Sequence, residues 1–198
     1  MLEARAISLA AREHAGQSYG SGEDTVRGGI ELTHIVHLQH VRDNTLKLAN
    51  VAGIGRYGTS MLMCVAWLHD LIEDTGATFN DIAKVYGFGT TIAEAVFSLS
   101  GHGRNRAERW ESTADLTKKN HVALFVRMAD RYANYAHARS QGTNGVPMSR
   151  MYEEEAEKFL TLIGEARNYC TEGNDAGFGV TSSTLSHAAF DYVASWFI

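Results

Sequence analysis

The segment AWLHDLIEDT holds the densest group of residues that could do chemistry. It places His69, Asp70, Glu73 and Asp74 at the end of a pattern that is otherwise apolar and helical, and burying such groups without partners is costly. On a helix, Glu73 stacks above His69 and Asp74 above Asp70, because each carboxylate comes four residues later. Neutral imidazole and carboxylate oxygen are both ligands of divalent metals. The spacing therefore predicts part of a metal site.

The remaining ligands of this site must come from other parts of the chain. His34 and Asp130 are the candidates, since each lies on an otherwise apolar helical stripe, the setting expected of a buried polar group with a partner such as a metal. His37 and His40 stand close to His34 and are alternatives to it. Their spacing relative to the apolar stripe is less favourable.

A second group of polar residues occurs in VRMADRYANYAHAR. Asp130, Arg131 and Asn134 lie within about one helical turn, and Asp130 and Asn134 share a face. A carboxylate, a guanidinium and an amide placed in this way could bind a metal, a phosphate and a sugar hydroxyl respectively. An ordinary surface ion pair would use the same residue types.

Composition narrows the class of protein. The chain has 198 residues, of which 44% are hydrophobic, and a formal net charge of -5. A molecule of this charge repels a phosphate backbone, so a nucleic-acid partner is not expected. Cys64 and Cys170 form no disulfide or CxxC pattern, and we find neither a signal peptide nor an apolar stretch long enough for a membrane span. These features indicate a cytoplasmic protein.

Apolar residues recur at helical spacing along nearly the whole chain, which predicts an all-α fold in one compact domain covering residues 1–198. Thr78 with Asp81, and Thr91 with Glu94, have capping-box spacing and should each open a helix. The polar segment 101–121 should be partly loop. The other helices are expected at residues 2–14, from about 33 to 52, 60–74, 120–141, 148–168 and, last, about 183–198.

Taken together, these motifs resemble the RelA/SpoT-type alarmone hydrolases of the HD-domain class, and especially the stand-alone small alarmone hydrolases similar to the metazoan SpoT homologue. The resemblance covers about residues 1–165 and rests on AREHAGQ, LTHIVHLQHV, WLHDLIEDT, FGTTIAEAVFSLS and VRMADRYAN. It implies a compact helical HD domain that holds one Mn²⁺ per chain and removes pyrophosphate from the 3′ position of ppGpp or pppGpp. The implied metal ligands are His34, His69, Asp70 and Asp130.

The resemblance also implies roles for other residues. Glu73 and Asp74 would orient or deprotonate the attacking water, Asn134 would contact the nucleotide sugar or phosphate, and Arg131 would support the site. Such a scheme is chemically consistent, because a metal lowers the pKa of its water while a nearby carboxylate takes the proton. Judged by charge alone, the leaving pyrophosphate would be neutralised by Arg104, Arg106 or Lys118.

Two positions depart from the family pattern. Tyr19 stands where the family has an arginine that packs on the guanine base, so either Arg27 takes over this contact or Tyr19 stacks on the base. Ile35 replaces the proline that usually follows the first histidine ligand. The altered base contact keeps open a second enzyme hypothesis, an HD-type phosphohydrolase acting on a dNTP, on NADPH or on an adenine alarmone.

A hypothesis of another class is a nucleotide sensor without catalysis, although every expected catalytic residue is present. The chain ends in an apolar cluster that includes Val193, Trp196 and Phe197. Such a cluster needs a cover, either from the same chain or from a second copy in a homodimer.

Overall fold

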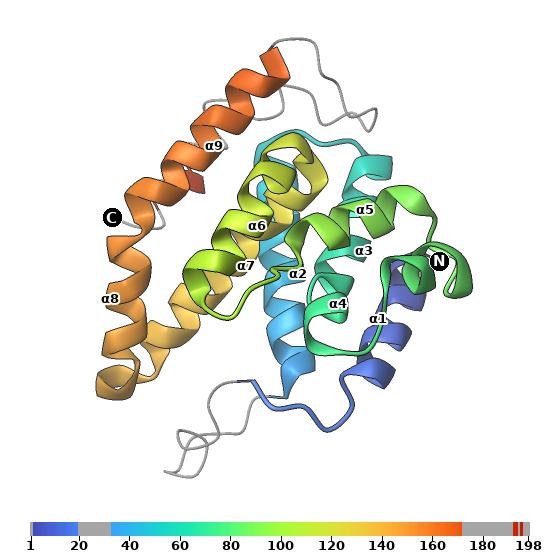
Figure 1. Ribbon diagram of the computed structural model, residues 1–198, viewed down its shortest axis with the longest axis horizontal. Coiled ribbons are helices and arrows are strands. Elements are labelled where there is room, and N and C mark those ends of the chain that lie inside the picture. The colour runs from blue at the N-terminus through green and yellow to red at the C-terminus, as the bar shows by residue number, and fades with distance from the viewer. Residues whose placement is uncertain (1, 20–32, 172–191, 194, 196–198) are drawn as a thin grey trace.

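The computed structural model describes residues 2–19, 33–171, 192, 193 and 195 (Figure 1). Within these residues the elements are helical, apart from an isolated bridge between Ser18 and Thr33. The predicted all-α class is confirmed. The α-helices are α1 (Leu2–Glu13), α2 (His34–Val51), α3 (Arg56–Leu68), α4 (Leu71–Asp74), α5 (Thr90–Leu99), α6 (Arg106–Lys119), α7 (His121–Ser140), α8 (Val146–Glu154) and α9 (Ala156–Thr171).

Helix α3 lies at the centre of the core. Every residue from 61 to 68 is buried, as expected for a helix that is apolar on all sides. It packs against α1, α2, α5 and α7, and α2 packs in turn along α7. In Figure 1, α1 and α3 lie on one side of the molecule, and α8 and α9 form the opposite edge. The core thus holds the end of α3, where the HD pair follows, in a fixed place.

The helix expected over residues 60–74 is interrupted. Helix α3 ends at Leu68 and α4 begins at Leu71. His69 keeps helical dihedral angles, whereas Asp70 has φ −90° and ψ −2°, the bridge region of the backbone map. The prediction of one continuous helix was therefore wrong, and the HD pair sits at the junction of two helices.

The segment 101–121 contains more helix than expected. Helix α6 covers Arg106–Lys119, and its N-cap is Asn105, whose side chain accepts a hydrogen bond from the Glu108 backbone amide at 3.0 Å. Its inward face carries Thr113 and Thr117, both buried. Loop structure is limited to the few residues before α6, so the polar composition reflects an exposed helical face.

Two predicted capping boxes had different outcomes. Thr78 and Asp81 exchange hydrogen bonds as expected, from the Thr78 amide to Asp81 Oδ2 at 2.9 Å and from the Asp81 amide to Thr78 Oγ1 at 3.2 Å. They open only a short π-helical turn, Asp81–Val85. Helix α5 instead begins after Gly89, whose φ of 85° favours glycine, without a side-chain cap. The box expected at Thr91 and Glu94 was wrong.

The single helix expected over residues 148–168 is two helices, α8 and α9, that meet at Glu155. Pro147 stands in the first turn of α8, where its missing amide costs nothing. Glu155 binds Arg106 through two hydrogen bonds of 2.8 and 2.9 Å and Arg131 through one of 3.1 Å. This carboxylate links α6, α7 and the α8–α9 junction. Of the helix expected at about 183–198, the structure describes only Tyr192, Val193 and Ser195; Tyr192 and Val193 are helical, and Val193 is buried.

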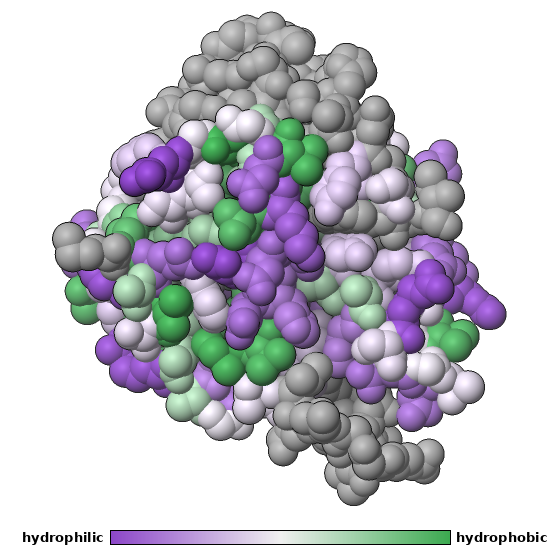
Figure 2. All heavy atoms as spheres, turned by 180° about the vertical axis from the view of Figure 1, so that it is seen from behind, coloured by the Kyte–Doolittle hydropathy of each residue, from purple (hydrophilic) through white to green (hydrophobic). Residues whose placement is uncertain are grey.

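Figure 2 shows the face opposite to that of Figure 1, where hydrophilic side chains run across the middle and hydrophobic ones lie in separate small groups. Scattered exposed apolar side chains of this kind are normal for a protein surface. Among the helices that the structure describes, none combines the length and the apolar character that crossing a membrane requires. The single-domain organisation stays a prediction.

Candidate metal centre

The first turn of α2 supplies two histidines. His34 and His37 are three residues apart, so they lie on neighbouring positions of one helical face. Both are buried. The backbone amide of His34 donates to Gln17 O at 3.0 Å, which ties the start of α2 to the segment after α1.

The junction between α3 and α4 supplies the HD pair. His69 Nδ1 bonds the carbonyl oxygen of Ala66 at 2.9 Å. A carbonyl can only accept, so Nδ1 is the donor and Nε2 faces the carboxylates. His69 is only 4% exposed, and its Nε2 has no hydrogen-bond partner. A second bond that fixes the ring in this way is typical of histidines that bind metals.

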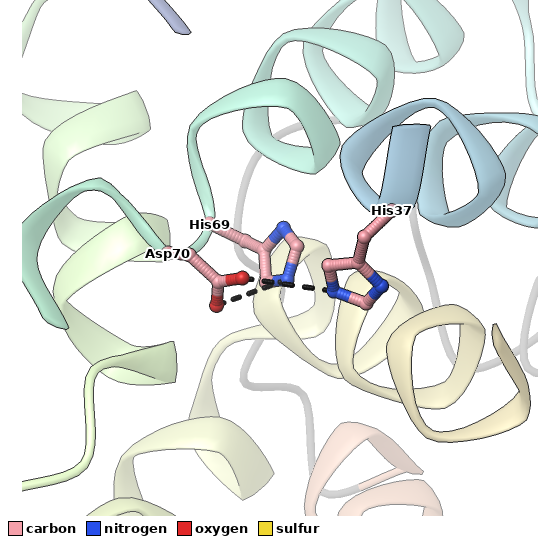
Figure 3. Close-up of side chains that lie close together, drawn as sticks. All are labelled: His37, His69 and Asp70. Carbon is pink, nitrogen blue, oxygen red and sulfur yellow. Dashed lines mark ion pairs between the residues drawn. The ribbon is translucent and has the colours of Figure 1, made fainter. Parts of the chain in front are cut away.

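Asp70 lies at the centre of the histidines. Its Oδ1 is 3.1 Å from His69 Nε2, and its Oδ2 is 3.2 Å from His34 Nε2 and 3.6 Å from His37 Nε2. Figure 3 shows His37 reaching from α2 toward His69 and Asp70 at the α3–α4 junction. Segments more than 30 residues apart in sequence therefore meet at one carboxylate.

Helix α7 contributes the second carboxylate. Asp130 Oδ1 is 3.2 Å from His37 Nε2 and 3.6 Å from His69 Nε2. The same oxygen accepts a hydrogen bond of 2.7 Å from Asn134 Nδ2. Asn134 accepts in turn from the Tyr19 hydroxyl, and the Tyr19 ring stacks on His37 with centroids 4.2 Å apart. A second layer of residues thus orients both Asp130 and His37.

The charges of this cluster depend strongly on one another. Burial alone would raise the pKa of Asp70, but His69 and His34 outweigh it and hold this pKa well below its usual value. Burial likewise opposes protonation of His69, yet Asp70 and Asp130 keep the pKa of His69 well above its usual value. The carboxylates therefore attract positive charge to His69 Nε2, and a bound cation would replace a proton there.

The donor set fits a divalent metal. Ligand atoms of His37, His69 and Asp70 lie within 4.8 Å of one another, and so do those of His34, Asp70 and Asp74. His34 Nε2, like His69 Nε2, is buried without a hydrogen-bond partner. Imidazole nitrogen with carboxylate oxygen suits Zn²⁺, Mn²⁺ or Fe²⁺. His34, His69, Asp70 and Asp130, the four ligands expected from sequence, all belong to this cluster, and so does His37, which the sequence offered as an alternative to His34.

Glu73 and Asp74 point to different neighbours. Asp74 Oδ2 lies 3.7 Å from His34 Nε2. Glu73 accepts hydrogen bonds from the Gly101 amide at 3.2 Å and from Arg109 Nη1 at 3.4 Å. Burial, followed by the nearby charge of Asp70, raises the pKa of both carboxyls. Both therefore hold a proton more readily than an exposed carboxylate does.

A pocket of about 530 Å³ opens beside the cluster, a size that suits a small-molecule ligand. His69, Asp70, Glu73 and Asp130 line one part of it. The rest carries five basic side chains: Arg106, Arg109, Arg127, Arg131 and Lys158. The net negative charge of the whole chain gives no sign of this basic pocket. Cations next to a metal centre are suited to an anionic ligand such as a phosphate.

Among the pocket cations that were not expected from the sequence, Arg127 is the most deeply buried. Its Nη1 donates to Thr113 Oγ1 at 2.7 Å and to Thr117 Oγ1 at 3.0 Å, and its guanidinium lies 4.7 Å from the centre of the Trp110 ring. Burial lowers its pKa to about 10. Its position three residues before Asp130 was the signal that could have found it, since both then share a face of α7.

Only some of the residues expected to bind substrate line the pocket. Arg131 and Asn134 line the pocket, and Arg131 also donates to Tyr152 O at 2.9 Å. One face of the Tyr19 ring is covered by His37. The Arg104 side chain is 93% exposed and pairs with Glu108, so it is not among the pocket residues, whereas Arg106 is. Arg27 lies outside the described residues.

The described helices form an all-α arrangement around a histidine–aspartate cluster that could hold a metal ion. No family model and no curated relative matches the chain. Among solved structures, it is similar to a metazoan orthologue of SpoT, described as hydrolysing ppGpp and playing a role in starvation responses. That match has a TM-score of 0.59 and 19% sequence identity, and it covers 98% of this chain and 94% of the other. At this identity the likeness shows a common fold.

Proposed function

We propose that the chain is a metal-dependent phosphohydrolase that converts ppGpp or pppGpp to GDP or GTP and pyrophosphate. The observation that carries this proposal is the position of the cluster around Asp70, at the end of a pocket lined by five cations. A nucleotide that carries phosphates at both its 5′ and its 3′ position suits this arrangement of metal centre and cations, since its 3′-pyrophosphate can meet both the metal centre and the basic side chains. The shared fold with a protein described as hydrolysing ppGpp supports the choice of substrate.

In this proposal, His34, His69, Asp70 and Asp130 hold one Mn²⁺. When bound there, such an ion would polarise a phosphoryl oxygen as a Lewis acid and lower the pKa of a water. Asn134 orients Asp130 through its 2.7 Å hydrogen bond. The basic residues of the pocket neutralise the phosphates of the substrate. The identity of the metal is part of the proposal and does not follow from the donor set alone.

The reaction needs a proton acceptor near the attacking water. Glu73 and Asp74 take this role because both are partly buried carboxylates with raised pKa. The water oxygen bonds to phosphorus as the bond from phosphorus to the 3′ oxygen breaks. The 3′ oxygen gains the proton that the carboxylate took from the water, and pyrophosphate leaves. The reaction consumes one water for each nucleotide that is hydrolysed.

A second candidate is hydrolysis of another nucleotide, such as a dNTP, NADPH or an adenine alarmone. It is favoured by Tyr19, which replaces the expected arginine and stacks on His37. A panel of these nucleotides and ppGpp, each incubated with Mn²⁺-loaded protein, compares the values of kcat/KM. The proposal expects ppGpp or pppGpp to give the highest value, and a higher value for any other member would replace it. A cytoplasmic location and a homodimer stay predictions.

A further inference from the structure

The five cations of the pocket differ in whether a carboxylate balances their charge. Arg106 and Arg131 both bind Glu155, at 2.8 and 3.1 Å, and Arg109 Nη1 lies 3.4 Å from Glu73 Oε1. Charge-assisted contacts of this kind are the strong ones. The charge of these three arginines is therefore largely met within the protein before any ligand binds.

Arg127 and Lys158 are the other two pocket cations. Within the part of the chain that the structure describes, neither forms an ion pair with a carboxylate. Arg127 Nη1 donates to the hydroxyl groups of Thr113 and Thr117, which carry no charge. A charge that leaves water favours a partner of opposite charge, so these two cations at the pocket wall favour an anionic ligand.

Trp110 brings the two cations to one place. Arg127 Cζ, from α7, and Lys158 Nζ, from α9, each lie 4.7 Å from the centre of the Trp110 ring. Helix α6, which carries Trp110, packs against both α7 and α9 (Figure 1). An aromatic ring attracts a cation without neutralising it, and like charges held close together disfavour each other. An anion bound to both cations would remove this repulsion.

We propose that Arg127 and Lys158 form an anion subsite that binds the distal phosphoryl group of the 3′-pyrophosphate. This inference rests on the proposed function and deepens it, because it names residues that distinguish a pyrophosphate from a single phosphate. Local charge in the sequence had pointed to other residues of α6 and the loop before it. Packing between α6, α7 and α9 points to Arg127 and Lys158 instead.

The order of residues along α7 supports this assignment. Asp130 faces the histidines of the cluster, and Arg127 comes three residues earlier, about 4.5 Å along the helix axis. Both residues line the same pocket. When one phosphoryl group lies at the cluster, the next one is therefore within reach of Arg127. Asn134, expected at the sugar, comes four residues after Asp130, so the nucleoside and the distal phosphoryl group extend in opposite directions.

A subsite of this kind would orient the bond that breaks. With the distal phosphoryl group held by two cations, the phosphorus that the water attacks meets the cluster in one orientation. Holding reacting groups in a fixed geometry lowers the barrier of a reaction. A nucleotide with a single 3′ phosphate has no distal group and loses this contact. Arg127 and Lys158 would thus select for the pyrophosphate.

Equilibrium dialysis of inorganic pyrophosphate tests the subsite directly. The full chain is dialysed against radiolabelled pyrophosphate, and separately against orthophosphate, with Mn²⁺ at the same concentration on both sides of the membrane. We expect the wild type to bind pyrophosphate roughly 10–100-fold more tightly than orthophosphate. Equal affinity for the two anions would overturn the proposal.

Substitutions assign this preference to the two cations. Arg127→Met should weaken pyrophosphate binding by roughly 10–100-fold, and Lys158→Met, at an exposed position, by about two- to fivefold. Both variants should keep the affinity for orthophosphate, and Lys158→Arg should keep the affinity for pyrophosphate. If Arg127→Met does not fold, the two variants of Lys158 decide. Unchanged pyrophosphate binding in Lys158→Met would then overturn the subsite.

Lys84→Met is the matched control. Lys84 is an exposed lysine of the turn Asp81–Val85 and does not line the pocket, so its loss removes the same charge elsewhere. It should leave the affinity for pyrophosphate unchanged. A loss equal to that of Lys158→Met would mean that overall charge, and not a subsite, attracts the anion.

GDP distinguishes the two phosphate groups of the nucleotide. It carries a 5′-diphosphate and has no 3′ phosphate, so Lys158→Met and Arg127→Met should bind it as the wild type does. A larger loss of affinity for GDP than for pyrophosphate would assign the two cations to the 5′ phosphates and contradict the proposal.

These binding measurements do not depend on turnover. If the wild type hydrolysed ppGpp but both substitutions left pyrophosphate binding unchanged, the subsite would be wrong and the proposed function would stand. If the substitutions weakened pyrophosphate binding but ppGpp were not hydrolysed, the subsite would stand and the proposed function would be wrong.

Discussion

Asn134 Nδ2 donates a hydrogen bond of 2.7 Å to Asp130 Oδ1, the same oxygen that faces His37 Nε2 at 3.2 Å. Asn134 thus determines how a ligand from α7 meets one from α2. The residue expected from sequence to touch substrate also has a role in holding the metal site. Residues that orient metal ligands are commonly worth 10–100-fold in metal affinity.

We therefore expect Asn134→Ala to weaken Mn²⁺ binding by roughly 10–100-fold, measured by titration calorimetry without nucleotide. Asn50→Ala, at an exposed position near the end of α2, is the control and should leave the affinity unchanged. An unchanged affinity in Asn134→Ala would mean that the hydrogen bond does not position Asp130.

Glu73 is predicted to accept the proton of the attacking water. Glu73→Gln keeps the shape and loses the basic oxygen, so kcat should fall by about 10²–10⁴-fold while bound metal stays the same. Glu94→Gln, on the exposed side of α5, controls for loss of a carboxylate. If kcat changed less than about tenfold, Asp74 or another group would have to accept the proton.

The sequence predicts that Tyr19 stacks on the nucleotide base; in the structure its ring stacks on His37 and meets His137 in an edge contact with centroids 4.9 Å apart. Base stacking on an aromatic ring is worth about 1–3 kcal/mol, so Tyr19→Ala should raise the KM for ppGpp about tenfold at saturating Mn²⁺. Tyr19→Phe keeps the ring and should keep this KM near the wild-type value. An equal rise in both variants would assign the effect to the hydroxyl that bonds Asn134.

Glu155 should make stability depend on pH. Its hydrogen bonds with Arg106, and then Arg131, lower its pKa from 4.5 to about 2. A lowered pKa stabilises the folded state above the unfolded value, and this contribution is lost as pH falls from about 4.5 toward 2. Urea unfolding of wild type and Glu155→Gln should therefore differ more at pH 6 than near pH 2. The exposed neighbour Glu154→Gln is the control; an equal difference at both pH values would contradict the ion-pair assignment.

The sequence was most informative where single polar residues interrupt an apolar helical stripe. His34, His69 and Asp130 were found in this way, because a buried ionisable group needs a partner and three such groups suggest a common one. The structure brings the HD pair together with His34, although the continuous helix predicted around the pair was wrong. No glycine or proline marks the break between Leu68 and Leu71, so helical periodicity alone predicted a continuous helix.

Features that depend on packing between helices could not be predicted in the same way. Periodicity places His34 and His37 near each other on α2, but only the contact of α2 with α7 shows that His37 meets Asp130. Local charge likewise suggested Arg104, Arg106 and Lys118, whereas of these three only Arg106 lines the pocket, together with Arg109. Side-chain direction around a helix axis depends on what the helix packs against.

The central claim is that this cluster hydrolyses the 3′-pyrophosphate bond. Protein loaded with Mn²⁺ is incubated with ppGpp, and the products are separated by anion exchange and identified by mass spectrometry, beside an Asp70→Ala variant. The account predicts GDP and intact pyrophosphate in equal amounts from the wild type and neither from the variant. Release of orthophosphate, the absence of turnover, or equal activity in Asp70→Ala would contradict it.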